Sequence, residues 1–459
     1  MKKLTITIFL LSFLSNPFLW ASKEELFPVP NGMQPDVDFW SKVYREWDTH
    51  QVVFYDSKSK IVYDVQDLPV VSKELSASKY KKEVKDHRSK IEAVIKKIKG
   101  KESIDKANQL ESKIYDVIKK NDLLVVEDLL DRLKQQSGLR THFEQGINNS
   151  GRYMQDMKAV LKAYGLPEEL IAIVFVESLF TLNATSHAGA SGPWGIVKET
   201  GLRLGIHINR FTDERVDPIF ATWAAARYLK QAFDSLGAWP LAITSYNYGF
   251  AGMMRASKNL NTKDLSIIHK LHDSPIYKYA SKSYYPEFLA ALDCLKNQER
   301  YFPKAKKQPL WKYELVQVKR PASAVDLASY QVINSDQLSN FNPSLSKMTI
   351  NGKEVIPPEY SLRVPEGMGK AFYKNLKKVP EQKRLAAANV NSTYKFLTKQ
   401  SISSFAKKNG ISADYLSKAL KKPFDYKLKG TIKVRSQAHL FSQLLDLNKE
   451  SGLGLFIKE

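Results

Sequence analysis

The pattern of apolar and polar positions divides the chain into regions, and the longest of them is helical. Residues 153–301 hold apolar helical segments separated by glycine-rich loops, without a clear period-two strand, which predicts an all-α block. Residues 72–136 carry many lysines, with apolar residues such as Ile91 and Ile95 spaced three and four apart, and are also predicted to be helical. Residues 27–68 are rich in proline and aromatic side chains, which is typical of an ordered arm that packs on another part of the chain.

The C-terminal third has a mixed pattern. Residues 311–318 alternate like a short strand, residues 324–338 are predicted to be helical, and residues 360–365 are predicted to be a second strand. Further on, the pattern predicts two more strands that flank two short helices: strands at 394–397 and 432–434, helices at 401–409 and 412–420. The fold class expected from the whole pattern is mainly α, with small α+β parts near the C-terminus.

Composition and charge narrow the choice of partner. The 459 residues are 43% hydrophobic, which excludes a wholly disordered chain, and the length favours two or three domains. Lysine and arginine number 70 against 48 acidic residues, a net charge of +22 that suits nucleic acid, an anionic membrane or an acidic wall polymer. The single cysteine, Cys294, excludes an intramolecular disulfide and any zinc site built on several cysteines.

The N-terminus predicts export. Lys2 and Lys3 precede an uncharged stretch that ends at Ser22, so residues 1–22 are predicted to be a signal peptide, and an uncleaved membrane anchor is the alternative. An exported protein does not ordinarily meet DNA. We therefore expect a partner in the cell wall or at the membrane and no nucleic-acid partner.

A glutamate at the end of an apolar helix is the candidate catalytic group. Pro167 suits the first position of a helix, and Glu168 and Glu169 follow it, where the helix dipole favours negative charge. The next residues, 170–176, are apolar all round, as in a buried helix. Glu177 comes next, where burial and the helix end both disfavour ionisation, as a general acid requires. A partly exposed glutamate that caps the helix is the alternative.

Two later segments hold candidate substrate-binding side chains. Residues 184–195 form a loop of small residues around one large aromatic residue, Trp194, which is expected to stack on a sugar. A later apolar run ends in Tyr246 and Asn247.

These segments resemble a known family. The catalytic part resembles the transglycosylase domain of the soluble lytic transglycosylase and goose-type lysozyme group, and the chain from Phe27 to Pro365 resembles the membrane-bound lytic murein transglycosylase D family. The matching motifs, in chain order, are Phe27-Pro28-Val29-Pro30 with Phe39-Trp40, Ser150-Gly151-Arg152-Tyr153, Gly165-Leu166-Pro167, Glu177-Ser178-Leu179-Phe180, Ala184-Thr185-Ser186, Gly189-Ala190, Gly192 with Trp194, Asp213-Glu214-Arg215 with Asp217-Pro218, and Tyr246-Asn247 with Gly249.

The resemblance implies a lysozyme-like α-helical domain that cleaves the β-1,4 bond between N-acetylmuramic acid and N-acetylglucosamine in peptidoglycan. It implies that Glu177 is the single acid/base and that the product is a 1,6-anhydro sugar. It also implies that Ser186 and Tyr246 orient the substrate and Glu177, that Asn247 lines the cleft, and that no cofactor or metal takes part. The acids of the segment 213–217 are expected to be structural ion pairs.

One position departs from the family pattern. Where the family usually has glutamine after the tryptophan, this chain has Gly195, so a polar side chain expected beside the substrate is absent. Glu177 remains in place. A catalytically silent peptidoglycan-binding protein and a lysozyme-type hydrolase are the alternatives to a lytic transglycosylase.

The C-terminal part resembles LysM, a small βααβ module that binds glycans containing N-acetylglucosamine. Its usual Gly-Asp-Thr turn is missing, and residues 325–365 are expected to be a more distant copy. The predicted organisation is a signal peptide (1–22), an N-terminal helical and arm region (23–150), the transglycosylase domain (151–301), a small α/β region (302–376), a linker (377–391), the LysM-like module (392–436) and a tail (437–459).

Overall fold

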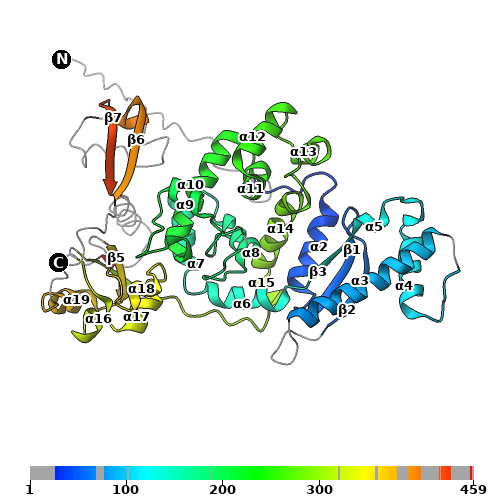
Figure 1. Cartoon of the computed structure of the whole chain (residues 1–459), viewed down its shortest axis with the longest axis horizontal. Coiled ribbons are helices and arrows are strands. Elements are labelled where there is room, and N and C mark those ends of the chain that lie inside the picture. Colours follow the sequence, from blue (N-terminus) through cyan, green and yellow to red (C-terminus); the bar gives the residue numbers. More distant parts are fainter. Residues whose placement is uncertain are drawn as a thin grey trace, which may run out of the picture.

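The computed structural model describes residues 26–68, 77–100, 103–186, 188–318, 321–356, 360–379, 391–404, 423, 425–435 and 455–456. In these residues the chain is mainly α-helical and forms three small sheets, which confirms the predicted fold class. Figure 1 shows a central helical domain, with one α/β part beyond α2 and a second α/β part below α7 and α9.

The first α/β part, here called the N-terminal α/β module, spans residues 51–137. Its central strand pairs antiparallel with both neighbours in the order β2-β1-β3, and its helices cover a separate apolar core. Its elements are β1 (Gln51–Asp56), β2 (Val62–Asp67), α3 (Ala77–Lys99), α4 (Gln109–Lys120), η1 (Leu123–Val125), α5 (Leu129–Arg132) and β3 (Leu133–Ser137).

The prediction of a helical and arm region was wrong for these three strands. Strand β1 has five consecutive buried residues, so its sequence shows no alternation of apolar and polar positions. Strand β3 lacks the alternation for the opposite reason, because Leu133 is its only buried residue and the rest of the segment is polar. Neither strand therefore shows the period-two signal on which the sequence interpretation relied.

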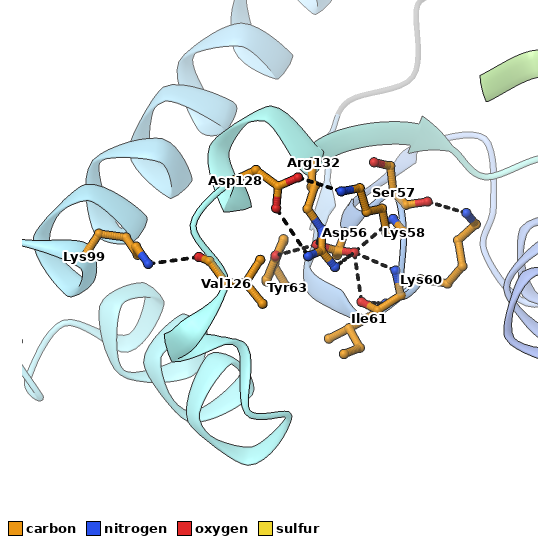
Figure 2. A network of polar contacts seen from close by, with 11 residues as sticks. Asp56, Ser57, Lys58, Lys60, Ile61, Tyr63, Lys99, Val126, Asp128 and Arg132 are labelled. Atoms are coloured by element: carbon orange, nitrogen blue, oxygen red, sulfur yellow. Dashed lines mark hydrogen bonds and ion pairs between the residues drawn. The ribbon is translucent and has the colours of Figure 1, made fainter. Parts of the chain in front are cut away.

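A polar network ties this module to the helical domain. Asp56, at the end of β1, accepts a hydrogen bond from Arg132 at 2.8 Å (Figure 2). Burial alone would raise the pKa of Asp56, but the bond from Arg132 holds it below its usual value. In the same turn, Lys60 forms an ion pair with Asp36 of α2 at 2.8 Å, and its ammonium lies 5.1 Å from the ring centre of Tyr279 on α14.

The central helical domain has one continuous apolar core, and no named strand interrupts its described residues between 138 and 312. The all-α prediction for this block is confirmed. Its elements are α2 (Gln34–Arg45), α6 (Arg140–Ser150), α7 (Met154–Ala163), η2 (Glu168–Ile171), α8 (Ala172–Ser178), α9 (Lys198–Leu204), η3 (Glu214–Val216), α10 (Pro218–Leu236), α11 (Trp239–Tyr248), α12 (Phe250–Asn259), α13 (Leu265–Leu271), α14 (Tyr279–Lys296) and α15 (Gln298–Tyr301).

The second α/β part, here called the βααβ unit, spans residues 313–379. Antiparallel strands β4 and β5 flank its helices over a core of their own, and β5 has the predicted bounds. The predicted helix 324–338 is two helices, because Gln331 has a left-handed φ of 53° and Asn334 begins a new helix with a capping box. The elements are β4 (Tyr313–Val318), α16 (Ala324–Ser329), α17 (Ser335–Phe341), α18 (Lys347–Ile350), β5 (Tyr360–Pro365) and α19 (Gly369–Leu376).

Near the C-terminus, β6 (Asn391–Ser401) pairs antiparallel with β7 (Lys427–Arg435), at the two places where outer LysM strands were predicted. β8 (Leu455–Phe456) pairs parallel with β4. The signal peptide, most of the linker, the two helices predicted between β6 and β7 except for residues 401–404, and the tail except for β8 lie outside the described residues. Across the part of the chain that the structure describes, no helix is both long and apolar enough to span a bilayer.

Candidate active site

Glu177 lies in the last turn of α8, whose first four residues are fully buried. The helix stops abruptly, because Leu179 and Phe180 have left-handed φ angles of 49° and 57°. That conformation costs non-glycine residues about 1–2 kcal/mol each. The buried ring of Phe180, 5.9 Å from that of Phe175, packs in the core and holds the turn. The core packing therefore fixes the place where the Glu177 side chain leaves the helix.

Helix α14 supplies a hydrogen-bond partner for this carboxyl. The Tyr284 hydroxyl donates to Oε1 of Glu177 at 2.5 Å. Burial raises the pKa of Glu177 to about 7, although the bond from Tyr284 acts in the opposite direction. The side chain of Glu177 is half-buried, and its raised pKa favours the general-acid interpretation over a partly exposed helix cap. Sequence reasoning missed Tyr284, which lies 107 residues further along the chain and carries no local motif that points to Glu177.

The loop of residues 184–196 meets the other side of the carboxyl through Gly195. This glycine has φ +59°, and a Cβ atom built on it would lie 2.3 Å from Oε2 and 3.0 Å from Cδ of Glu177. By comparison with the family pattern, Gly195 stands for the loss of a polar side chain. In the structure, the Glu177 carboxyl itself occupies the space that a side chain at position 195 would need.

Trp194 does not have the role predicted for it. Its indole is fully buried, and its Nε1–H donates to Thr222 Oγ1 at 2.7 Å inside the core. No face of the ring is open to a sugar, so the expectation that Trp194 stacks on substrate was wrong. Because the loop folds back over α10, its one large residue anchors the loop to the core.

The other predicted substrate-binding residues lie around the same loop. The Tyr246 hydroxyl donates to the Trp194 carbonyl at 2.9 Å, and burial followed by the charge of Glu177 raises the Tyr246 pKa. Ser186 is exposed, and its Oγ accepts the Ala190 N–H at 3.1 Å within the loop. Asn247 is exposed, and its Oδ1 accepts the Ser281 hydroxyl at 2.8 Å. Contacts of Ser186, Tyr246 and Asn247 with a glycan stay predictions.

The acidic residues of the connecting segment (residues 207–217) are bound to cations or to histidine. Asp213 pairs with Arg215 at 2.7 Å, and Glu214 contacts the His207 ring at 3.0 Å. Asp217 pairs with Arg363 of β5 at 2.6 Å. The structure thus has the ion pairs that the sequence analysis expected here.

A second acid, Glu287, is half-buried and interacts electrostatically with Glu177. Glu287 follows Tyr284 by one turn on α14. Burial, and then the charge of Glu177, raise its pKa to about 8, while Lys60 acts in the lowering direction. Both carboxyls therefore hold a proton more tightly than an ordinary glutamate does. The sequence analysis did not single out this residue.

The arrangement suits one group that both donates and accepts a proton. A carboxyl with a pKa near 7 is present in both forms at neutral pH, which is the condition for general acid and general base catalysis by the same side chain. No group of three or more potential metal ligands occurs among the described residues.

Comparison with known families assigns this part of the chain. Residues 156–268 match the family model of the Transglycosylase SLT domain. This region is therefore similar to SLT domains. It includes Glu177, the loop 184–196 and Asn247, whereas Tyr284 and Glu287 follow it on α14. The helical character predicted for this domain is confirmed by the helices that the structure places there.

The matched region and its surroundings are similar to named lytic transglycosylases. Over 274 residues the chain is 29% identical to the membrane-bound lytic murein transglycosylase D of Escherichia coli K12, covering 57% of this chain and 58% of that protein. The same figures hold for the protein of that name in Escherichia coli O6:H1. The chain thus spans less than two thirds of the length of these curated relatives. Among solved structures, an inactive mutant of the lytic transglycosylase Slt from Pseudomonas aeruginosa matches with 20% identity over 43% of this chain and 29% of that chain, at a TM-score of 0.28.

Proposed function

We propose that this protein is a peptidoglycan lytic transglycosylase. It cleaves the β-1,4 bond between N-acetylmuramic acid and N-acetylglucosamine and leaves a 1,6-anhydromuramoyl end. The observation that carries this proposal is the half-buried carboxyl of Glu177, which lies within the SLT match, accepts a hydrogen bond from Tyr284 and has its pKa raised to about 7. The names of the relatives, which are murein transglycosylases, support the same substrate class.

Glu177 acts twice in the proposed reaction. The protonated carboxyl gives its proton to the glycosidic oxygen as the bond from that oxygen to C1 breaks, while the acetamido group of the muramoyl sugar stabilises the positive charge. The carboxylate then takes the proton of the C6 hydroxyl as O6 bonds to C1. No water is consumed, and Glu177 ends protonated as it began. Between the two steps the hydroxyl of Tyr284 stabilises the carboxylate by donating to it.

The surroundings of Glu177 support a mechanism with one carboxylate. Glycosidases that use two carboxylates need the second one ionised, as a nucleophile or a base. Asp213 and Asp217 are held in ion pairs, and Glu287 keeps its proton until about pH 8. Ser186 and Asn247 are exposed and are proposed to bind the glycan, while Tyr246 acts through the Trp194 carbonyl.

The proposal includes a location and a second binding region. Export by residues 1–22, attachment to the wall or membrane, and glycan binding by residues 392–436 agree with the net charge of +22. A chain that ends near residue 389 should keep its activity on soluble glycan fragments and bind whole sacculi less well, because tethering raises the local substrate concentration. Equal retention of both chains on sacculi would contradict the LysM interpretation.

Mass spectrometry of the products tests the reaction. The purified protein is incubated with sacculi, and released muropeptides are examined for anhydro ends, which are lighter than hydrolysed ends by one water. Anhydro products are expected. Ordinary reducing ends would favour a lysozyme-type hydrolase, and binding without any release would favour a silent peptidoglycan-binding protein.

A further inference from the structure

The βααβ unit holds the connecting segment through direct hydrogen bonds. The Asp213 N–H donates to the Ser344 carbonyl at 2.8 Å, and the Ser346 N–H donates to the Phe211 carbonyl at 2.8 Å. The Thr349 hydroxyl donates to the same Phe211 carbonyl at 2.9 Å. The middle of the connecting segment is therefore positioned by a different part of the molecule from the one that carries Glu177.

A buried ion pair fixes the end of the same segment. Arg363 of β5 donates to both carboxylate oxygens of Asp217, at 2.6 and 3.0 Å, and both side chains are buried. Asp217 also caps α10 by accepting the N–H groups of Ile219 and Phe220. Loss of one member of such a pair would leave an uncompensated buried charge, so the geometry is strongly specified.

Arg215 connects this segment to the loop 184–196. Its Nη1 donates to the carbonyls of Gly189 and Ile196, at 2.8 and 3.3 Å. The other edge of the same guanidinium donates to Asp213, at 3.0 and 2.7 Å. The backbones are in close contact as well, because a Cβ atom on Gly192 would lie 1.7 Å from the Arg215 carbonyl oxygen.

The loop in turn bounds the carboxyl of Glu177. Ser191 and Ile196 exchange backbone hydrogen bonds at 3.0 and 3.1 Å, so the loop closes on itself next to the carbonyls that Arg215 holds. Gly195 lies between these residues and places its Cα against the carboxyl. A shift of the Ile196 carbonyl therefore shifts the backbone that faces Glu177.

We propose that Arg215 is a positioning residue for the reaction. The βααβ unit fixes the position of the connecting segment, and Arg215 connects this segment to the loop 184–196 by hydrogen bonds, which keeps the loop in place beside Glu177. This inference rests on the proposed function. It gives the βααβ unit a part in catalysis that is separate from any binding of glycan, because the unit supports the backbone beside the catalytic acid.

Arg215→Met tests the inference in the full chain. The variant should fold, and its kcat should fall at least about tenfold, since misplacement of a catalytic group by about 1 Å can cost a hundredfold. A loosened loop would admit water to Glu177, so burial would raise the pKa of Glu177 less and the alkaline limb of the rate profile would move to lower pH. The titratable groups that face Glu177 are Tyr284 and Glu287 on α14, Tyr246 on α11 and Tyr44 on α2, and the substitution changes none of them.

Arg210→Met is the matched control. Arg210 is an exposed arginine of the same segment, and its side chain pairs with Glu354 of the βααβ unit at 3.5 Å and lies over the ring of Phe211 rather than on the loop. This variant should keep the parent's kcat and pH profile. Arg215→Lys, which can still pair with Asp213 but lacks the planar fork that reaches two carbonyls, should lose part of the rate. Parent-like kcat and pH profile in Arg215→Met, or an equal loss in Arg210→Met, would overturn the inference.

Hydrogen exchange tests the coupling without turnover. Arg215→Met should lower the protection of the Ser191 and Ile196 amides, and Arg363→Lys should lower protection in both the connecting segment and the loop. Unchanged loop protection in both variants would also overturn the inference. If the parent releases no product while these protection changes occur, the proposed function fails and the positioning role of Arg215 is retained.

Discussion

The two sides of the Glu177 carboxyl are built differently. On the loop side the backbone of Gly195 faces it, and a Cβ atom at this position would lie 2.3 Å from Oε2, so a side chain there would displace the carboxyl. On the helix side a hydroxyl from α14 donates to it, with a second, half-buried acid one turn further along. The loop side therefore restricts the position of the Glu177 carboxyl by steric contact, whereas the helix side changes the pKa of that carboxyl. The predictions below separate these two effects.

Glu177→Gln removes the carboxyl that the loop and α14 both contact, and it should lower the rate more than the other substitutions do. Glutamine keeps the shape of glutamate but can neither donate a proton to the glycosidic oxygen nor accept one from the C6 hydroxyl. General acid/base catalysis is worth about 10²–10⁴ in rate, so anhydro-muropeptide release should fall at least about a hundredfold. Thermal stability should hold or rise, because a half-buried ionisable group is lost. A folded variant with a rate near the parent's would mean that another residue is the acid.

Gly195→Ala tests the loop side and should cost about 10- to 100-fold in kcat. The new Cβ would overlap Oε2 of Glu177, so the carboxyl must move away from its present position. Gly195→Gln, which restores the polar side chain usual in the family, should not raise activity for the same reason.

Gly189→Ala is the control for backbone strain at Gly195. Gly189 lies in the same loop with φ +76°, but a Cβ atom there would meet nothing within 4 Å. Both alanine variants impose a left-handed conformation on a residue with a side chain, and only one places an atom against Glu177. If the two lose activity equally, strain rather than displacement of the carboxyl explains the loss at position 195.

The sequence predicts the two sides of Glu177 unequally. Glu177 and the loop 184–196 are local motifs, so their residues can be found by spacing and resemblance. Tyr284 reaches the site through the packing of α14 against α8, and no spacing rule reports such a contact between distant segments. Trp194 shows a further limit, because it was expected to stack on a sugar and is buried in the core, and its neighbours in the sequence do not distinguish these two positions.

The small α/β parts show a similar contrast. In the βααβ unit the strand at 360–365 was predicted with its observed bounds. In the N-terminal α/β module no strand was predicted, because β1 is buried over five residues in a row and β3 over only one. Alternation of apolar and polar residues identifies a strand that has one buried face and one face in solvent. A strand that is buried on both faces, or that is almost wholly exposed, does not show this alternation.

Tyr284→Phe tests the helix side and should lower kcat by about tenfold, the value of one hydrogen bond to a charged group. The bond from Tyr284 lowers the pKa of Glu177, so its loss should raise that pKa above about 7. Because the acid must be protonated to act, the alkaline limb of the pH profile should move to higher pH. This shift has the opposite sign from the one expected for Arg215→Met.

Tyr285→Phe is the matched control on the same helix. Its hydroxyl donates to the Pro28 carbonyl at 3.0 Å rather than to Glu177. The control should therefore leave the pH profile in place. A profile that is unchanged in Tyr284→Phe would contradict a hydrogen bond from Tyr284 to the catalytic acid.

Glu287→Gln should have the smallest effect on activity, within about twofold, and should instead change how stability depends on pH. The pKa of Glu287 is about 8 in the folded chain, above its ordinary value of 4.5, so the folded state holds this proton more tightly than the unfolded state does. The associated stability is complete below pH 4.5 and is lost as pH rises to about 8. Glutamine resembles the protonated form and does not titrate. The free energy of unfolding of the variant, relative to the parent, should therefore increase between pH 5 and pH 8, by on the order of 2 kcal/mol.

Urea unfolding of both proteins at several pH values measures this difference, and Glu299→Gln, at an exposed position of α15, controls for the loss of one glutamate. A parallel pH dependence in Glu287→Gln and parent would mean that Glu287 is not an acid that costs stability at neutral pH. A rate loss as large as that of Tyr284→Phe would place Glu287 in the proton transfer itself. The predicted result is a change in stability with little change in rate. It would mean that, of these two residues on α14, only Tyr284 directly affects proton transfer by Glu177.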